Sequence, residues 1–146
     1  MNNQAGRPVG VLLVEDDEGD VILTREAFEY YRIPHSLHVV SDGDEALQFV
    51  RRQGRFAGEA RPDLVLLDLN LPRRGGLEVL AELKADLELR VIPVVVLTTS
   101  RADEDIVSSY ARHANAYVSK PVEAAGFMRV IRQIDNFFAQ VAELPR

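Results

Sequence analysis

Four short stretches of the sequence end in polar side chains that together could perform phosphoryl chemistry. These ends are Glu15-Asp16-Asp17, Asp68-Leu69-Asn70, Thr98-Thr99-Ser100 and Ser119-Lys120-Pro121. Carboxylates crowded at one place repel one another and ionise together only where a cation neutralises them. Mg²⁺ is such a cation, because it takes oxygen ligands and retains waters. An ionised aspartate could then attack phosphorus, while the metal and a lysine offset charge on the phosphoryl oxygens.

Each of these residues also has an ordinary structural interpretation. An aspartate that follows a strand is commonly a turn former or a helix cap. Lys120-Pro121 favours a functional lysine, because proline pushes the preceding residue out of helical geometry and permits a cis bond that could aim the lysine inward, but a plain turn is the alternative. Four polar ends in one chain favour the chemical interpretation over four separate turns.

The elements that must position these residues are five short apolar runs with helical patterns between them. The predicted strands are Val11 to Val14, Leu37 to Val40, Leu64 to Leu67, Val94 to Leu97 and Ala116 to Val118. Continuous Val/Leu runs, rather than alternating ones, are typical of a parallel sheet covered by helices on both faces. The sequence therefore predicts an α/β fold, in which functional groups gather at the carboxyl ends of the strands.

The helices between these strands carry their own start signals. The first is predicted to be capped at Asp20, the second to start at Ser41 or Asp42, the third at about Gly76 and the fourth at Ser100. These assignments follow from capping residues placed before apolar stripes at helical spacing. Five β-α units result.

Composition limits the class of protein. The 146 residues are 47% hydrophobic and contain no cysteine, which fits one domain in a reducing cytoplasm. No apolar run approaches the roughly 20 residues of a membrane span, and a net charge of −6 disfavours nucleic acid as a direct partner. We expect residues 1–8 to be a flexible N-terminal segment and residues 9–146 to form the domain, with an extended C-terminal helix.

The polar ends and their flanking residues resemble those of bacterial response regulator receiver domains over roughly Val9 to Asn136. The matching motifs are Val14-Glu-Asp-Asp17, Leu67-Asp-Leu-Asn-Leu-Pro72, Leu97-Thr98 and Tyr117-Val-Ser-Lys-Pro121. The resemblance implies a flavodoxin-like (βα)5 three-layer sandwich whose parallel five-stranded sheet has the order 2-1-3-4-5. It also implies a two-component phosphorelay protein that catalyses only its own phosphorylation and dephosphorylation.

The resemblance assigns roles to individual residues. Asp68 would be the phosphoacceptor, Asp17 a direct Mg²⁺ ligand, Asp16 a mostly water-mediated one and Asn70 a ligand through its backbone carbonyl, while Thr98 and Lys120 would hold the phosphate. Thr98 and Tyr117 would form a switch that alters the surface of the fourth helix, fifth strand and fifth helix. Tyr117 could instead be an aromatic end to an edge strand.

A narrower resemblance concerns the partner. The stretches 15–20 and 92–100 and the C-terminal residues 137–145 look like those of receivers partnered with bacterial phytochromes. This resemblance implies a sensor histidine kinase of the bacteriophytochrome type and a light-signalling pathway. Another sensor kinase remains open, since a few surface residues set partner choice.

The last helix carries more apolar side chains than one sheet face requires. They form two adjoining stripes, and exposed apolar patches usually mark association. We therefore predict a homodimer whose surface includes Phe127, Ile131, Phe137, Phe138 and Val141. The alternative is a wide core-facing helix with a packed tail.

Competing functions differ in the residues they need. A phosphatase with a catalytic Asp-x-Asp motif would need a second carboxylate where Asn70 stands. A nucleotide-binding domain would need glycines, not three acids, after the first strand. A phosphate sink or a phosphorylation-independent adaptor for another kinase remains open. Arg73 and Arg74 could meet an acidic partner or lie in a solvated loop, and the three histidines have no metal-binding spacing.

Overall fold

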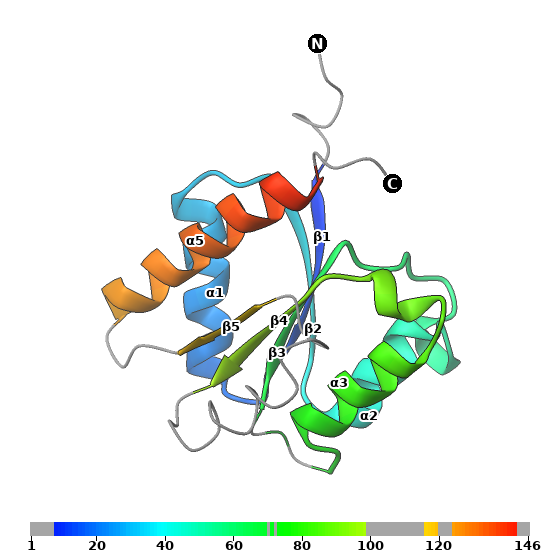
Figure 1. The fold of residues 1–146 in the computed structure, drawn as a ribbon. Coiled ribbons are helices and arrows are strands. Elements are labelled where there is room, and N and C mark those ends of the chain that lie inside the picture. Colours follow the sequence, from blue (N-terminus) through cyan, green and yellow to red (C-terminus); the bar gives the residue numbers. More distant parts are fainter. Residues whose placement is uncertain (1–7, 70, 72, 99–115, 120–123, 143–146) are drawn as a thin grey trace.

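The protein is a three-layer sandwich around one parallel sheet (Figure 1). The computed structural model describes residues 8–69, 71, 73–98, 116–119 and 124–142, and leaves out the side chains of 98, 116–119 and 137–142. The strands are β1 (Val9–Val14), β2 (His35–Val40), β3 (Leu64–Asp68), β4 (Val94–Thr98) and β5 (Ala116–Ser119). Their order is β2-β1-β3-β4-β5 with every pairing parallel. The predicted flavodoxin-like fold and its strand order are confirmed.

Helices cover both faces of this sheet. They are α1 (Glu18–Tyr30), α2 (Gly43–Val50), α3 (Gly76–Ala85) and α5 (Ala124–Ala142), with short 3-10 helices η2 (Gly54–Phe56) and η3 (Leu89–Val91). Figure 1 shows α1 and α5 on one face and α2 and α3 on the other. None of the helices in the described part of the chain is long and apolar enough to cross a bilayer. The helix predicted to start at Ser100 lies outside the described residues.

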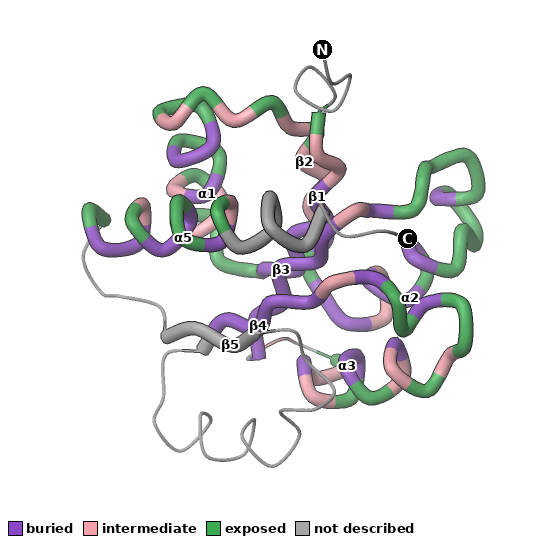
Figure 2. The backbone as a smooth tube through the Cα atoms, turned by 45° about the horizontal axis from the view of Figure 1, so that its top comes forward, coloured by how far each residue is buried: buried purple, intermediate pink, exposed green. Residues whose placement is uncertain are grey.

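Alternate residues of the central strands enter two separate cores. Leu12 and Leu67 point toward α2 and α3, whereas Leu13 and Leu66 point toward α1 and α5. All four are at most 1% exposed, and Figure 2 shows the buried sheet between helices that are exposed on their outer sides. Each such side chain contributes about 1.5–3 kcal/mol relative to an exposed one. Burial on both faces explains why the strand sequences are continuous apolar runs rather than alternating ones.

The helix starts agree with the sequence in two cases and differ in one. Asp42 caps α2, its Oδ1 accepting the Glu45 N–H at 2.8 Å, and α3 begins at Gly76, both as predicted. The prediction that Asp20 caps the first helix is wrong. Asp17 caps α1 instead, because its extended backbone lets its carboxylate reach the first free N–H groups of the helix.

The described part of α5 corrects the predicted dimer surface. Phe127 and Ile131 are 2% and 0% exposed and belong to the core between α5, α1 and the sheet. They cannot lie on an exposed dimer face, because the stripe they occupy is the one that covers the sheet. The side chains of Phe137, Phe138 and Val141 lie outside the described residues.

Candidate metal centre

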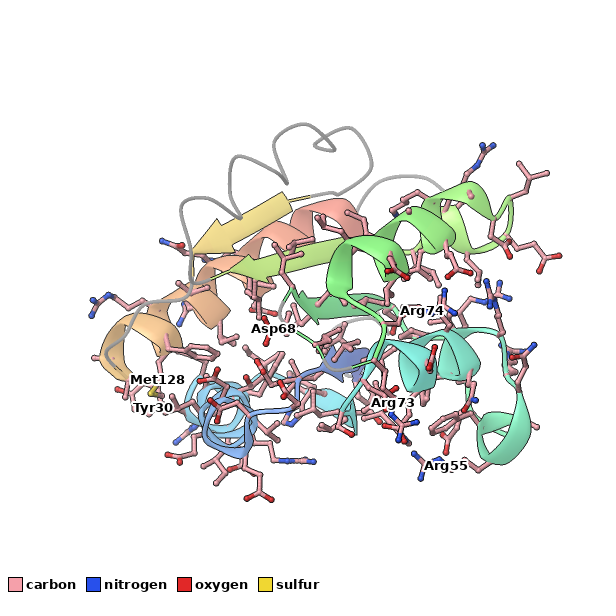
Figure 3. All side chains as sticks on the ribbon, turned by 90° about the horizontal axis from the view of Figure 1, so that it is seen from below. Tyr30, Arg55, Asp68, Arg73, Arg74 and Met128 are labelled. Carbon is pink, nitrogen blue, oxygen red and sulfur yellow. The ribbon has the colours of Figure 1, made fainter. Side chains whose placement is uncertain are left out.

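The strand register brings two separate acidic segments to the same edge of the sheet. Val14 of β1 is paired with Leu67 of β3. The next residues, Glu15 and Asp68, therefore emerge side by side at the carboxyl ends of their strands. Figure 3 looks at this edge and labels Asp68 between α1, drawn in blue, and the loop that carries Arg73 and Arg74.

Three carboxylates converge at this edge. One oxygen each of Glu15, Asp16 and Asp68 lies within 4.8 Å of the others. Glu15 and Asp68 are buried, at 2% and 5% exposure, whereas Asp16 is exposed. Glu15 also accepts the Asp17 N–H through Oε2 at 3.3 Å. The cluster thus has two buried carboxylates on its inner side and one that faces solvent.

This arrangement suits a hard divalent cation. The donors are all oxygen, as Mg²⁺ and Mn²⁺ prefer, and no histidine or cysteine takes part in the described group. Like charges this close repel one another, and a cation removes that repulsion. The solvent-facing Asp16 leaves an open side, through which water or a phosphoryl group could reach the ion.

Asp17, expected as a direct metal ligand, has a different place in the structure. Its Oδ1 accepts the backbone N–H groups of Gly19 at 2.8 Å and Asp20 at 3.4 Å, which satisfies two donors at the start of α1. The sequence placed Glu15, which completes the carboxylate cluster, at this edge but did not indicate that it rather than Asp17 would approach Asp68. A signal for this was present in the sequence. Asp17 stands three residues before the acidic Asp20, a spacing typical of an N-cap, which favours Asp17 as the cap and leaves Glu15 and Asp16 for the cluster.

The backbone of Asp68 is tightly enclosed by the start of α3. A Cβ atom on Gly76 would lie 2.5 Å from the Asp68 carbonyl oxygen and 2.7 Å from the Leu69 Cα. The Gly76 N–H donates to the Leu69 carbonyl at 3.1 Å, and the Leu69 N–H donates to the Leu97 carbonyl at 3.2 Å. A glycine is therefore required at position 76, because only a hydrogen fits against this peptide.

The other predicted site residues are only partly described. Thr98 is the last residue of β4 and is paired with Ser119 of β5, and Tyr117 is paired with Val96. Their backbones thus belong to β4, which pairs with β3, and to β5, which pairs with β4 at the edge of the sheet. Asn70 and Lys120 lie outside the described residues, so their roles stay predictions.

The histidines of the described chain pack against aromatic rings, away from this edge. His35 stacks on Phe28 with 4.9 Å between ring centroids, and His38 lies 4.5 Å from Phe49. Neither belongs to the group of possible metal ligands. Their packing agrees with the absence of metal-binding spacing in the sequence, which favoured surface or packing roles, and His113 lies outside the described residues.

Comparisons with known proteins agree with this fold and this acidic edge. The family model described as "Response regulator receiver domain" matches residues 11–132. Response regulator Rcp1 of Synechocystis sp. is 39% identical over 145 residues, covering 99% of each chain. The structure of its Mn²⁺-bound form has a TM-score of 0.85 at 40% identity and covers 95% of this chain and 100% of that one.

Two further solved structures are similar over nearly the whole chain. The phosphorylated cyanobacterial phytochrome response regulator RcpA has a TM-score of 0.87 at 42% identity, covering 96% of this chain and 100% of RcpA. The bacteriophytochrome response regulator RtBRR has a TM-score of 0.74 at 36% identity, covering 96% of this chain and 98% of RtBRR. Fold, site and sequence therefore lead to one conclusion: the chain belongs to the response regulator receiver domain family.

Proposed function

We propose that the chain is a phosphorylation switch in which Asp68 accepts a phosphoryl group from a phytochrome-type sensor histidine kinase, with Mg²⁺ bound beside it. The observation that carries this proposal is the convergence of Glu15, Asp16 and Asp68 within 4.8 Å at the carboxyl edge of the sheet. Receiver domains act in two-component phosphorelays and bind a divalent metal. They are not enzymes that turn over a substrate, because they catalyse only their own phosphorylation and dephosphorylation.

In the proposed reaction, a carboxylate oxygen of Asp68 attacks the phosphorus of a phosphohistidine. An O–P bond forms as the N–P bond of the donor breaks, and the leaving imidazole nitrogen takes up a proton from solvent. The peptide of Asp68 is held by Gly76 and by the ladder to β4, so the nucleophile starts from a fixed backbone.

The carboxylate cluster would hold the metal through Asp16 and Asp68, with Glu15 behind them. When bound, the divalent ion offsets the charge of the carboxylates and of the phosphoryl oxygens. The buried Glu15 forms the inner side of the site, and the exposed Asp16 lies on the side that stays open to solvent. In this proposal Asp17 keeps its role as a helix cap and does not bind the ion directly.

The switch and assembly parts of the proposal rest on the family resemblance. Thr98 and Lys120 are proposed to bind the phosphoryl oxygens, and Thr98 and Tyr117 to alter the surface of β5 and α5. A homodimer is proposed through the C-terminal part of α5, around Phe137, Phe138 and Val141, and no longer through the buried half of that helix. A cytoplasmic location fits a partner kinase that phosphorylates its receiver there.

Intact-mass measurement with a small phosphodonor tests the phosphoacceptor. The wild-type protein, incubated with acetyl phosphate and Mg²⁺, should gain one phosphoryl group, and Asp68→Asn should gain none. Equal gain by the variant would show that another residue is the acceptor. No gain by the wild-type protein would refute the mechanism.

A transfer assay tests the kinase class. Phosphoryl transfer from a purified phytochrome histidine kinase should be faster than transfer from an unrelated histidine kinase at equal concentrations, because partner choice depends on surface complementarity. Equal rates would contradict the phytochrome assignment while leaving the receiver chemistry intact.

A further inference from the structure

Two consecutive arginines on the loop after Asp68, Arg73 and Arg74, bind acidic side chains of α2 and α3. Arg74 is the more enclosed of the two. Its Nε donates to Asp44 Oδ1 at 2.9 Å and its Nη1 contacts Glu82, with Glu78 Oε2 at 3.9 Å. One guanidinium is thus surrounded by carboxylates from both α2 and α3, and these contacts raise its pKa, the hydrogen bond to Asp44 most of all.

The main chain of Arg74 is held as closely as its side chain. A Cβ atom on Gly43 would lie 2.2 Å from the Arg74 carbonyl oxygen and 2.8 Å from the Arg74 Cβ. The start of α2 therefore touches the loop backbone with nothing between them. Because these atoms are in direct contact, a shift of the loop at this residue would also require a shift of α2.

The neighbouring residue is fixed in an uncommon conformation. Arg73 has φ 66°, in the left-handed region that arginine rarely adopts. Its Nε lies 3.6 Å from Asp42 Oδ2, and the other oxygen of Asp42 caps α2. Residues 73 and 74 thus dock onto the three successive residues 42–44, and Figure 3 shows both arginines beside α2, drawn in cyan.

The two ends of the same loop are fastened to the peptide of Asp68. The loop leaves at Leu69, which is bonded to β4, and returns at Gly76, which packs on the Asp68 carbonyl. The side-chain contacts of Arg74 are therefore made two residues before Gly76, where the chain returns to the proposed phosphoacceptor.

We propose that Arg74 is a positioning residue for the phosphorylation site: by binding Asp44 and Glu82 it fixes residues 73–75, which lead into Gly76, and with them the Asp68 peptide on which Gly76 packs. This inference rests on the proposed function of Asp68. Its physical basis is that small displacements matter at such a site. A shift of about 1 Å in a reacting group can cost about a hundredfold in rate, and loss of a group that orients metal ligands typically costs about 10- to 100-fold in affinity.

A role in stability alone would have a different signature. The ion pairs of Arg74 are partly exposed, with 37% of the arginine side chain and 46% of the Asp44 side chain accessible. Partly exposed pairs contribute little to the free energy of unfolding. A positioning role therefore predicts a loss of metal binding and phosphorylation rate that is much larger than the loss of stability.

Arg51 supplies a matched control for this test. Its Nη2 lies 3.0 Å from Oε1 of Glu82, the same acidic partner, and its side chain is exposed to a similar extent. Arg51 stands at the far end of α2, and its one described ion pair does not involve the loop. Arg51→Gln removes an ion pair to Glu82 that does not involve the loop, whereas Arg74→Gln removes an ion pair to the same Glu82 together with those to Asp44 and Glu78.

The experiment compares the two variants by Mn²⁺ affinity, by the rate of phosphoryl gain from acetyl phosphate and by urea unfolding. Arg74→Gln should lower the affinity or the rate by about tenfold, while Arg51→Gln stays within about twofold of wild type. Both should shift the urea midpoint by small amounts, Arg74→Gln by the larger one because it loses three partly exposed partners and Arg51→Gln loses one. Asp44→Asn should act in the same direction as Arg74→Gln, with no further loss in the double variant, because the two side chains work as one unit.

Each outcome decides one question. If wild type binds Mn²⁺ and is phosphorylated but the two arginine variants behave alike, the positioning role is overturned and the proposed function stands. If wild type is never phosphorylated, the proposed function fails, and the Mn²⁺ affinities alone decide whether Arg74 orients the carboxylates. Wild-type protein that neither binds Mn²⁺ nor gains a phosphoryl group would overturn both.

Discussion

The contact between Gly76 and Asp68 yields a sharp prediction for Gly76→Ala. The added methyl group would lie 2.5 Å from the Asp68 carbonyl oxygen and 3.2 Å from its carbonyl carbon. Both are backbone atoms, so relief requires α3 or the end of β3 to move by several tenths of an ångström. Overpacking of this kind costs about 1–3 kcal/mol, against which alanine regains at most about 1 kcal/mol of helix propensity.

Because both close contacts are with backbone atoms, we take the upper end of the overpacking cost, about 3 kcal/mol, less the helix gain of about 1 kcal/mol. We therefore expect Gly76→Ala to lower the free energy of unfolding by about 2 kcal/mol, equivalent to roughly 4–8 °C in Tm for a chain of this size. Urea unfolding followed by circular dichroism measures the change. Gly75→Ala is the control, because nothing lies within 4 Å of a Cβ there and its φ of −67° suits alanine. Equal stability of both variants would refute the argument from close approach.

Three further predictions concern the caps and the core. Asp17→Ala should cost about 1 kcal/mol of stability, whereas Asp17→Asn, which retains a capping oxygen, should cost much less in the same urea assay. The backbone N–H of Ser41 donates to Glu45 and lowers the pKa of that carboxyl group. The ionised Glu45 should therefore stabilise the fold fully above pH 4.5, and this stabilisation should be lost as the pH falls through the folded-state pKa of Glu45. Urea unfolding between pH 3 and 6 should show this loss in wild type but less of it in Glu45→Gln. Phe127→Ala should lower the free energy of unfolding by about 3–5 kcal/mol. The loss should be the same at low and high protein concentration, because Phe127 is in the core. A loss that depends on protein concentration would show that Phe127 lies in a dimer interface.

The strands could be predicted from continuous apolar runs, because both faces of the sheet are buried, whereas their order came from the family resemblance. Runs such as Leu64 to Leu67 contain no polar residue, and the structure places alternate members in two different cores. Continuous apolar runs of this length occur where both sheet faces are covered. The carboxyl ends of these runs then indicate which acidic residues share one edge.

The choice among three adjacent acids could not be made in the same way. Glu15, Asp16 and Asp17 are of one chemical kind, and their roles depend on the residue at which α1 begins. That start is set by backbone geometry, which gives Asp17 an extended conformation with its carboxylate on Gly19 and Asp20. Once Asp17 is the cap, Glu15 and Asp16 are the residues left to approach Asp68.

The role of the last helix also depended on more than its own sequence. Phe127 and Phe137 belong to adjoining stripes, and hydrophobic spacing alone does not say which stripe covers the sheet. The packing of α5 against α1 assigns the stripe of Phe127 to the core. The arginines 73 and 74 were likewise ambiguous, because their partners lie on helices that are distant in the sequence.

Mn²⁺ binding by the acidic variants shows which carboxylates form the metal centre. Free Mn²⁺ gives an electron paramagnetic resonance signal that is lost on binding, so titration yields a dissociation constant without a reaction. We expect Asp16→Asn and Asp68→Asn each to weaken binding by at least about tenfold, and Asp17→Asn, which keeps its cap, to change it by no more than about threefold. Strong weakening by Asp17→Asn with little effect of Asp16→Asn would contradict the metal centre described above.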